Sequence, residues 1–286
     1  MAQLSGNKQL TDSRGNALFS LRDISFLDGA EKEKIYSKLI PLRLYDLLGI
    51  KHGNFSNASG GTKIRFIAPH GLGIMRIEVR MCPDDQDMVF FLELSDTHYR
   101  QMELSFCIIN DVTAPRYDVD KDESGKDNCF ASKGRNIPEE IRAMEAGLSP
   151  NHTHHGLKMF KEVFTLLELF VDSLGMEMIV AEPLTYDNAI RYEKYGFDYI
   201  IGKRLMWDIN EGFKPGGILF KRLDNSTPFR RPEMASTVFG RSWSIHDGIM
   251  DEPWDDVRIY KMIGQSADIN TFPERQETNY SRFNHQ

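Results

Sequence analysis

The chain has 286 residues, 41% of them hydrophobic and 11% aromatic, so it can bury a full core as one large domain or as a domain with an extension. Its formal net charge of −7 argues against a broad nucleic-acid-binding surface, because such surfaces use Lys and Arg to displace counterions. The three cysteines, Cys82, Cys107 and Cys129, indicate reduced thiols rather than a disulfide framework. Residues 1–20 lack the apolar stretch of a signal peptide, and no run approaches the roughly 20 apolar residues of a membrane-spanning helix. We therefore expect a cytoplasmic protein that binds neither membranes nor nucleic acids.

The N-terminal part of the chain predicts one strand and two short helices. The apolar run 17–25 is expected to form the first strand. Asp28 and Glu31 then stand at the D-x-x-E spacing of a capping box, which predicts a helix directly after them. Pro41 should split this helix, because proline removes a backbone donor, and a second helix should run over 42–48.

Four strand-like runs follow, rich in β-branched and aromatic residues and separated by short polar turns. They cover 63–68, 74–81, 88–94 and 101–109. We expect these runs to form an antiparallel meander. The next stretch, 111–150, is polar and charged, and we expect it to be a long loop of the kind that is functional or disordered.

A strong helical period begins after this loop. Apolar side chains at i, i+3 and i+4 spacing predict a helix over 157–174, and a short buried strand should follow over 178–181. Asp187 can cap a second helix that ends at Gly196, and strand character returns over 197–207.

The predicted element order is β, α, α, meander, α, β, α, β. It indicates a mixed α/β domain with a central sheet flanked by helices. We assign 1–15 to a flexible N-terminus and 16–210 to this domain, with a long loop at 111–155. The remaining residues, 211–286, are assigned to a C-terminal extension.

The segment from Asn188 to Phe197 reads N-A-I-R-Y-E-K-Y-G-F. Its Y-E-K-x-G-F part resembles the stretch that ends the last helix in the GNAT superfamily of N-acetyltransferases, and the element order above is that of the GNAT fold. In this resemblance Gly196 supplies the left-handed helix end, and Phe197 starts the next strand inside the core. The match departs from the family in one respect. Ala189 lies one position closer to the tyrosine than is usual, and the family's leading Asn would fall near Thr185.

The resemblance also implies a site for acetyl-CoA or another acyl-CoA. In the family, an R/Q-x-x-G-x-G/A loop opens the long helix, and its backbone N–H groups and the helix dipole hold the pyrophosphate. The matching residues here are Thr153, His154, His155, Gly156, Leu157 and Lys158. Gly156 fits the pattern, whereas Thr153 replaces Arg or Gln and Lys158 replaces the second small residue. Asn188 is a further cofactor-binding candidate.

Direct acyl transfer is the chemistry that the resemblance implies. An amine attacks the thioester carbonyl, which a backbone amide of the strand 101–109 polarises. Glu103 and Asp111 are the candidates for the general base that takes the amine proton. Tyr192 resembles the family tyrosine that protonates the leaving thiolate. We expect a small-molecule or protein amine as the acceptor, and we consider a homodimer as the assembly.

Each candidate also has a purely structural interpretation. Tyr192 can be a helix tyrosine packed near a sheet, Glu103 and Asp111 can simply face solvent, and Gly156 can be an ordinary loop glycine. A second function class is therefore open, a catalytically silent GNAT-fold binding module whose acyl-CoA site has drifted.

A third function class is a metal-dependent enzyme. His152, His154 and His155 cluster before the long helix, and with His246-Asp247 they offer imidazole and carboxylate ligands suited to zinc or iron. The spacing matches no established metal signature, and two adjacent histidines cannot easily face one ion. A polar loop whose histidines respond to pH is the alternative interpretation.

Overall fold

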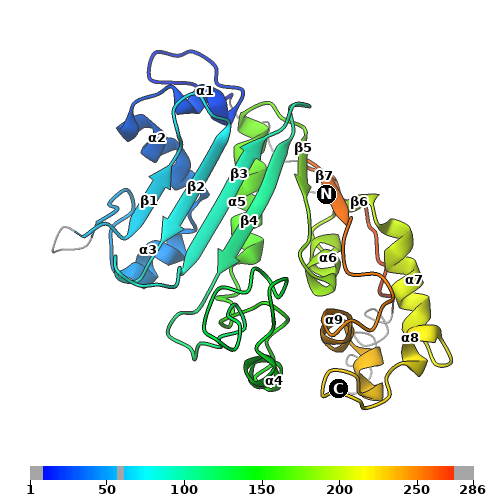
Figure 1. Ribbon diagram of the computed structural model, residues 1–286. Helices are drawn as coiled ribbons and strands as arrows, with labels where there is room; N and C mark the ends of the chain where they lie inside the picture. The colour runs from blue at the N-terminus through cyan, green and yellow to red at the C-terminus, as the bar shows by residue number, and fades with distance from the viewer. Residues whose placement is uncertain (1–8, 57–60, 274–286) are drawn as a thin grey trace, which may run out of the picture. The chain divides into compact units, whose positions relative to one another are not determined.

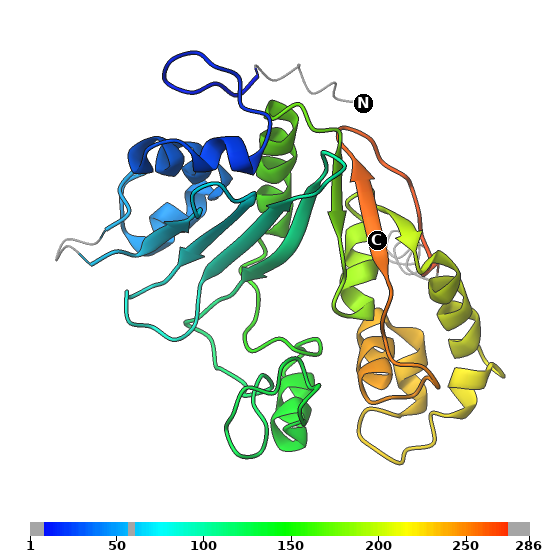
Figure 2. The same ribbon diagram turned by 45° about the horizontal axis from the view of Figure 1, so that its top comes forward.

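A seven-stranded mixed sheet flanked by helices organises the chain, as the sequence predicts for the fold class. The computed structural model describes residues 9–56 and 61–273. The strands lie in the order β1-β2-β3-β4-β5-β7-β6 (Figures 1 and 2). Their bounds are β1 Ile64–Ile67, β2 Ile74–Val79, β3 Phe90–Asp96, β4 Met102–Ile109, β5 Met178–Ala181, β6 Asp198–Ile201 and β7 Arg258–Met262.

Two compact units divide the chain. The first comprises 1–116, 154–181 and 261–265, and the second comprises 117–153, 182–260 and 266–286. The expected boundaries of a flexible N-terminus, a domain and an extension stay predictions, and residues 1–8 lie outside the described part of the chain.

The four strands β1 to β4 form the antiparallel meander that the sequence predicts. Alternate residues of β2 and β3 are fully buried, including Ile77, Val79, Leu92 and Leu94, as expected for a sheet with one covered face. The helices of the first unit cover that face: α1 contacts β2 and β3, and α2 contacts β1. The helices of the first unit are α1 (Leu21–Ser25), α2 (Gly29–Tyr36), α3 (Leu42–Leu48) and α5 (Phe160–Ser173).

The expected first strand over 17–25 is wrong, because this run contains helix α1. Ser20 caps the helix by accepting a hydrogen bond from the Asp23 N–H at 3.0 Å. Asp96, at the end of β3, accepts the N–H groups of Leu21 and Arg22 at 3.0 and 2.9 Å. A carboxylate from a distant strand thus satisfies orphan donors of the helix start and overrides the local strand signal.

The two expected N-terminal helices are confirmed with small changes of their bounds. Asp28 caps α2 by accepting the Glu31 N–H at 2.9 Å. Pro41 is the N-cap of α3, and a short 3-10 turn, η1 (Ser37–Leu39), separates it from α2. Gly49 ends α3 in the left-handed conformation with φ of 65°.

Several elements of the second unit differ from those that the sequence predicts. The expected strand over 197–207 ends at Ile201, because Gly202 takes a φ of 95° and helix α7 (Lys203–Phe213) begins after it. The expected loop 111–150 contains a helix, α4 (Ile137–Glu145). The other elements are α6 (Tyr186–Glu193), α8 (Ile218–Lys221), η2 (Pro232–Ser236) and α9 (Val238–His246).

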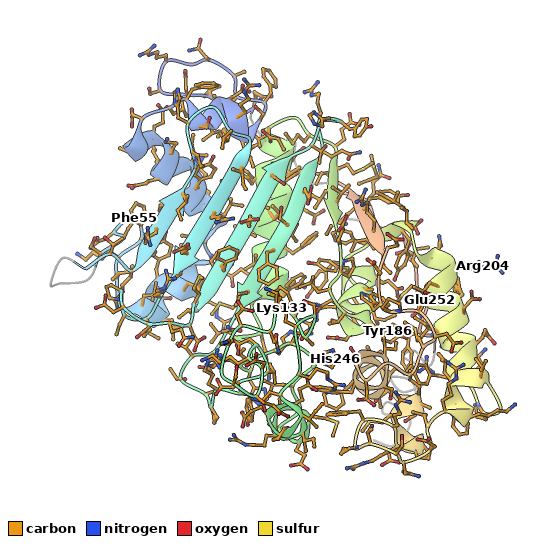
Figure 3. The ribbon with its side chains drawn as sticks, in the orientation of Figure 1. Phe55, Lys133, Tyr186, Arg204, His246 and Glu252 are labelled. Atoms are coloured by element: carbon orange, nitrogen blue, oxygen red, sulfur yellow. The ribbon has the colours of Figure 1, made fainter. Side chains whose placement is uncertain are left out.

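A buried charge network ties α4 to the loop after α9. Glu140 has a 2% exposed side chain and bonds both Arg135 and His246, the latter at 3.1 Å (Figure 3 labels His246). Arg135 also donates to Asp247 at 2.9 Å, and Arg230 donates to the other oxygen of that carboxylate at 2.8 Å. Buried charges are stable only when they are paired in this way.

Acid is expected to weaken this network. Burial raises the pKa of Glu140, but the hydrogen bonds from His246 and Arg135 outweigh that effect, so its pKa lies below the ordinary 4.5. Its contribution to the free energy of unfolding is therefore complete above pH 4.5 and is lost as the pH falls through the lower folded-state pKa. Replacing Glu140 by Gln should lower that free energy at pH 7 by about 2–3 kcal/mol and flatten its acid dependence, because Arg135 then loses one of its two charged partners and keeps only Asp247.

Urea unfolding between pH 2.5 and 7 measures this effect. The exposed Glu145 at the end of α4 is the matched control, and Glu145→Gln should unfold like the wild type at every pH. An acid profile of Glu140→Gln that parallels the wild-type profile would contradict the assignment.

Candidate functional site

The parallel pair of β4 and β5 stops half-way along β4. Met102, Glu103 and Leu104 pair with Ile179, Val180 and Ala181, where β5 ends, while β4 continues to Ile109. The pairing of β3 with β4 shifts register at the same level, and Ser105 is the additional residue on β4. Such a bulge leaves one residue unpaired and bends its strand. The two parallel strands therefore separate beyond Leu104, and β4 carries backbone groups past the end of its parallel neighbour.

The long segment 111–155, the excursion, begins and ends next to the end of β4. Asn110 forms an isolated antiparallel bridge with Gly156, and the Asp111 N–H donates to the His155 carbonyl at 2.7 Å. A Cβ on Gly156 would come within 3.3 Å of the Ile109 carbonyl oxygen, so glycine permits this close approach. The predicted loop ahead of the long helix is therefore fixed against the bulged strand.

The long helix begins three residues later than the sequence predicts. Leu157 lies outside α5, which starts at Phe160, because Gly156 is engaged with β4 and Lys158 takes a left-handed φ of 56°. The N-cap residue Met159 makes no side-chain capping hydrogen bond. The first-turn N–H groups of a helix have no partner within the helix, so this end is suited to an anion. The exposed Lys158 adds a positive charge directly before it.

The two candidate bases lie on or next to β4. Glu103 is half-buried and pairs with Ser95 of β3 and Val180 of β5. The hydrogen bond from the Thr113 hydroxyl, at 2.5 Å, is the main reason that the pKa of Asp111 lies below its ordinary value. A carboxylate with a lowered pKa is a weaker proton acceptor, so Glu103 is the better candidate for the general base.

The Y-E-K-x-G-F segment forms the end of α6 and the start of β6. Gly196 has a φ of 85°, and the Phe197 N–H donates to the Tyr192 carbonyl at 3.3 Å. Phe197 is 1% exposed, and its ring lies edge-on to the half-buried Tyr192 ring at 4.9 Å. The roles expected for the glycine and the phenylalanine of the motif are confirmed.

The glutamate of the motif has a structural role that the sequence analysis missed. Glu193 is 4% exposed, and its carboxylate accepts the Tyr199 hydroxyl at 2.6 Å and the Thr271 hydroxyl at 2.5 Å. Burial raises the pKa of Tyr199 strongly, and the negative charge of Glu193 raises it further. The only sequence signal for this role is the position of a glutamate on the apolar side of α6.

Asp187 is not the cap of α6, which corrects the sequence prediction. Thr185 is the N-cap, without a side-chain capping bond, and Asp187 lies buried in the first turn. Its carboxylate accepts the hydroxyls of Thr185 and Ser242, both at 2.7 Å, so it fixes α6 to α9. Asn188 follows it in the same turn and is half-buried.

The candidate residues belong to two units. Glu103, Asp111 and the loop His154 to Lys158 are part of the first unit, whereas Thr153, Asn188 and Tyr192 are part of the second. Thr153 accepts the Tyr117 N–H through its carbonyl at 2.9 Å, so its backbone joins the two ends of the excursion.

The histidines proposed as metal ligands have separate surroundings. His152 contacts the Pro150 carbonyl at 3.0 Å, His154 is 3% exposed near Asp87, and His155 is exposed. His246 bonds Glu140. Within residues 9–56 and 61–273, no group of three or more His, Cys, Asp or Glu side chains is arranged to hold a metal ion.

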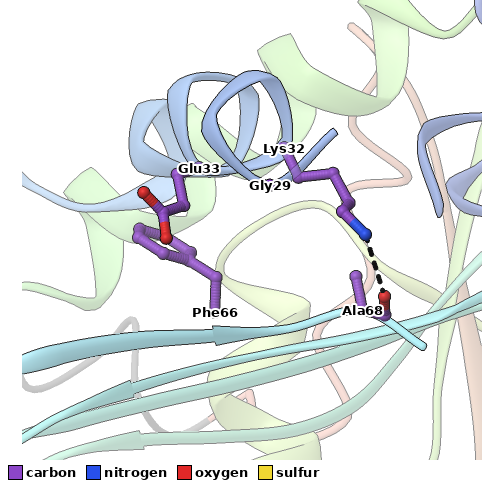
Figure 4. A pocket seen from close by; sticks show the side chains of 5 residues that line it. All are labelled: Gly29, Lys32, Glu33, Phe66 and Ala68. Atoms are coloured by element: carbon purple, nitrogen blue, oxygen red, sulfur yellow. Dashed lines mark hydrogen bonds between the residues drawn. The ribbon is translucent and has the colours of Figure 1, made fainter. Parts of the chain in front are cut away.

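A small pocket of about 180 Å³ lies elsewhere, between α2 and β1 (Figure 4). Lys32 and Glu33 stand at its rim, Phe66 and Ala68 line it, and the Lys32 ammonium is 3.5 Å from the Ala68 carbonyl oxygen. Two strands, β2 and β3, separate β1 from β4 in the sheet, so this pocket is not part of the β4–β5 junction.

Comparison with protein-family models, curated proteins and solved structures gave no match. The geometry of the β4–β5 junction and the resemblance of the α6 segment are therefore the features that bear on function. Of the described helices, none has the length and apolar character that crossing a membrane requires.

Proposed function

We propose that the chain is an acyl-CoA-dependent N-acyltransferase of the GNAT type, which transfers an acyl group, normally acetyl, directly to an amine. The observation that carries the proposal is the combination of three features along β4 and at its end. The parallel pairing ends at Leu104 and Ala181, β4 bulges at Ser105, and the loop before α5 joins the end of β4 through Gly156. After the additional helix α4, the order α5, β5, α6, β6 also agrees with that of the GNAT fold.

The residues present fit the pyrophosphate of an acyl-CoA. A helix start without a side-chain cap directs N–H groups outward, and Lys158 supplies a cation next to them. The acyl-CoA supplies the thioester. Backbone N–H groups of β4 beyond Leu104 would donate to its carbonyl oxygen and stabilise the negative charge that develops there.

The proposed mechanism assigns a residue to each proton transfer. The amine nitrogen forms a bond to the carbonyl carbon, and the carbon–sulfur bond breaks. Glu103, through water where needed, takes the proton that the amine loses. The resemblance of the α6 segment to the GNAT motif implies that Tyr192 gives a proton to the leaving thiolate. The acceptor is a small-molecule or protein amine.

The substitution at Lys158 favours one alternative, a GNAT-fold binding module without activity. A long side chain with a left-handed backbone stands where the family has a small residue. A side chain there can cover the amides that the pyrophosphate needs.

Release of free CoA separates the two functions. The protein is incubated with acetyl-CoA and a set of primary amines, including polyamines and lysine-containing peptides, and free thiol is titrated. Transfer predicts thiol release together with an acceptor whose mass increases by one acetyl group. Acetyl-CoA binding without thiol release for any amine would support the inactive module instead.

A further inference from the structure

His154 is nearly buried although it belongs to the polar loop that leads into α5. It is 3% exposed, and its Nε2 lies 3.9 Å from Oδ2 of Asp87, in the connection between β2 and β3. Arg116 donates to the same Asp87 oxygen at 2.9 Å. The Thr113 hydrogen bond is the main cause of the lowered pKa of Asp111, and the electrostatic interaction with His154 lowers that pKa further.

Protonation of His154 adds one positive charge to this cluster. Asp87, Asp111 and Arg116 are charged groups near the imidazole, and they come from the β2–β3 connection and from the start of the excursion. Histidine is the side chain whose ordinary titration falls between pH 5 and 8.

The cluster is joined to the proposed pyrophosphate loop through the backbone. His155, directly after His154, accepts the Asp111 N–H through its carbonyl, and Gly156 forms the bridge with Asn110. A charge on His154 therefore acts on both the position and the local potential of residues 155–158. A negative charge at this place opposes the binding of an anion, and the opposition falls off only over the Debye length of roughly 10 Å.

We propose that His154 is a positioning residue for the acyl-CoA pyrophosphate, and that its protonation next to Asp87 adds a positive charge beside the loop 155–158 and tightens anion binding there. This inference rests on the proposed function.

Dephospho-CoA is the suitable probe, because it keeps the pyrophosphate but lacks the 3′-phosphate, a group of the kind that titrates near pH 6. Its dissociation constant is measured by calorimetry from pH 5.5 to 8.0. Between these limits the wild type should lose roughly fivefold in affinity, the effect expected of one partly screened charge. The variant His154→Gln should bind with a pH-independent affinity. The matched control is His155→Gln, since this neighbouring side chain is exposed, and it should keep the wild-type profile.

Equal pH profiles for the wild type and His154→Gln would overturn the inference, and so would a wild-type affinity that does not change with pH. Failure to bind dephospho-CoA at any pH would instead refute the proposed function. In that case amide hydrogen exchange of residues 155–159, corrected for intrinsic rates, decides the role of His154. Protection that increases on acidification in the wild type but not in His154→Gln supports positioning, and equal protection overturns it.

Discussion

Replacing Tyr192 by Phe should lower kcat for acyl transfer about 100-fold while the Kd for acetyl-CoA changes by less than about twofold. In the proposed mechanism the phenol gives a proton to the leaving thiolate, so its loss should act on the chemical step rather than on ground-state binding. The ring of Tyr192 packs edge-on against Phe197, and phenylalanine preserves this contact. The substitution therefore removes the hydroxyl without removing the packing.

Steady-state kinetics with thiol detection, together with calorimetric binding, measure both quantities. Tyr195→Phe, three residues later and also half-buried, is the matched control and should retain wild-type kcat. An unchanged kcat in Tyr192→Phe would remove this residue from the mechanism. A large loss of acetyl-CoA affinity would show that it binds rather than protonates.

Replacing Trp243 by Ala should lower the free energy of unfolding by about 3–5 kcal/mol. Trp243 is fully buried in α9 and stacks on Phe229 with the ring centroids 5.1 Å apart. Its indole N–H donates to the Leu148 carbonyl at 2.9 Å, which joins α9 to the segment after α4. Alanine leaves both a cavity and an unsatisfied buried carbonyl.

Urea unfolding followed by circular dichroism tests this expectation. Trp207→Ala on α7 is the control, because that indole is 40% exposed and its loss should cost less than about 1 kcal/mol. If both variants unfold at the same urea concentration, the core of the second unit is not centred on Trp243.

The sequence predicts secondary structure correctly where residues close in sequence form the pattern or the cap that defines the element. Strands β2 and β3 of the meander alternate in burial, and the capping spacing of Asp28 with Glu31 and the left-handed Gly196 each act within a few residues. The run 17–25 has the apolar pattern of a strand, but Asp96, far away in sequence, supplies the acceptor for the start of helix α1.

Helix α4 and strand β7 were not predicted, and only α4 has a clear signal in the sequence. Helix α4 is preceded by Asn136, which caps it, and has Pro138 and acidic residues in its first turn, so its start could have been predicted. Strand β7 gave only a five-residue alternation, and its pairing with β6, for example Tyr199 with Ile259, spans about 60 residues. Register over that distance is set by packing rather than by local pattern.

Only part of the candidate site can be predicted from the sequence. Gly156 and the helix after it follow from the sequence pattern, but the bulge at Ser105 and the burial of His154 depend on tertiary contacts. The ion pair of Arg135 with Asp247 joins residues that are 112 positions apart, and no spacing rule predicts it.

Calorimetric titration of the protein with acetyl-CoA, compared with the variant Gly156→Val, tests the central claim most directly. We expect a single site in the wild type and a Kd at least tenfold weaker in the variant, because a side chain at Gly156 meets the Ile109 carbonyl and displaces the loop from β4. Gly29→Val, where an added Cβ meets no atom within 4 Å, should bind like the wild type. Absence of acetyl-CoA binding to the wild type, or equal affinity of wild type and Gly156→Val, would contradict an acyl-CoA site at the start of α5.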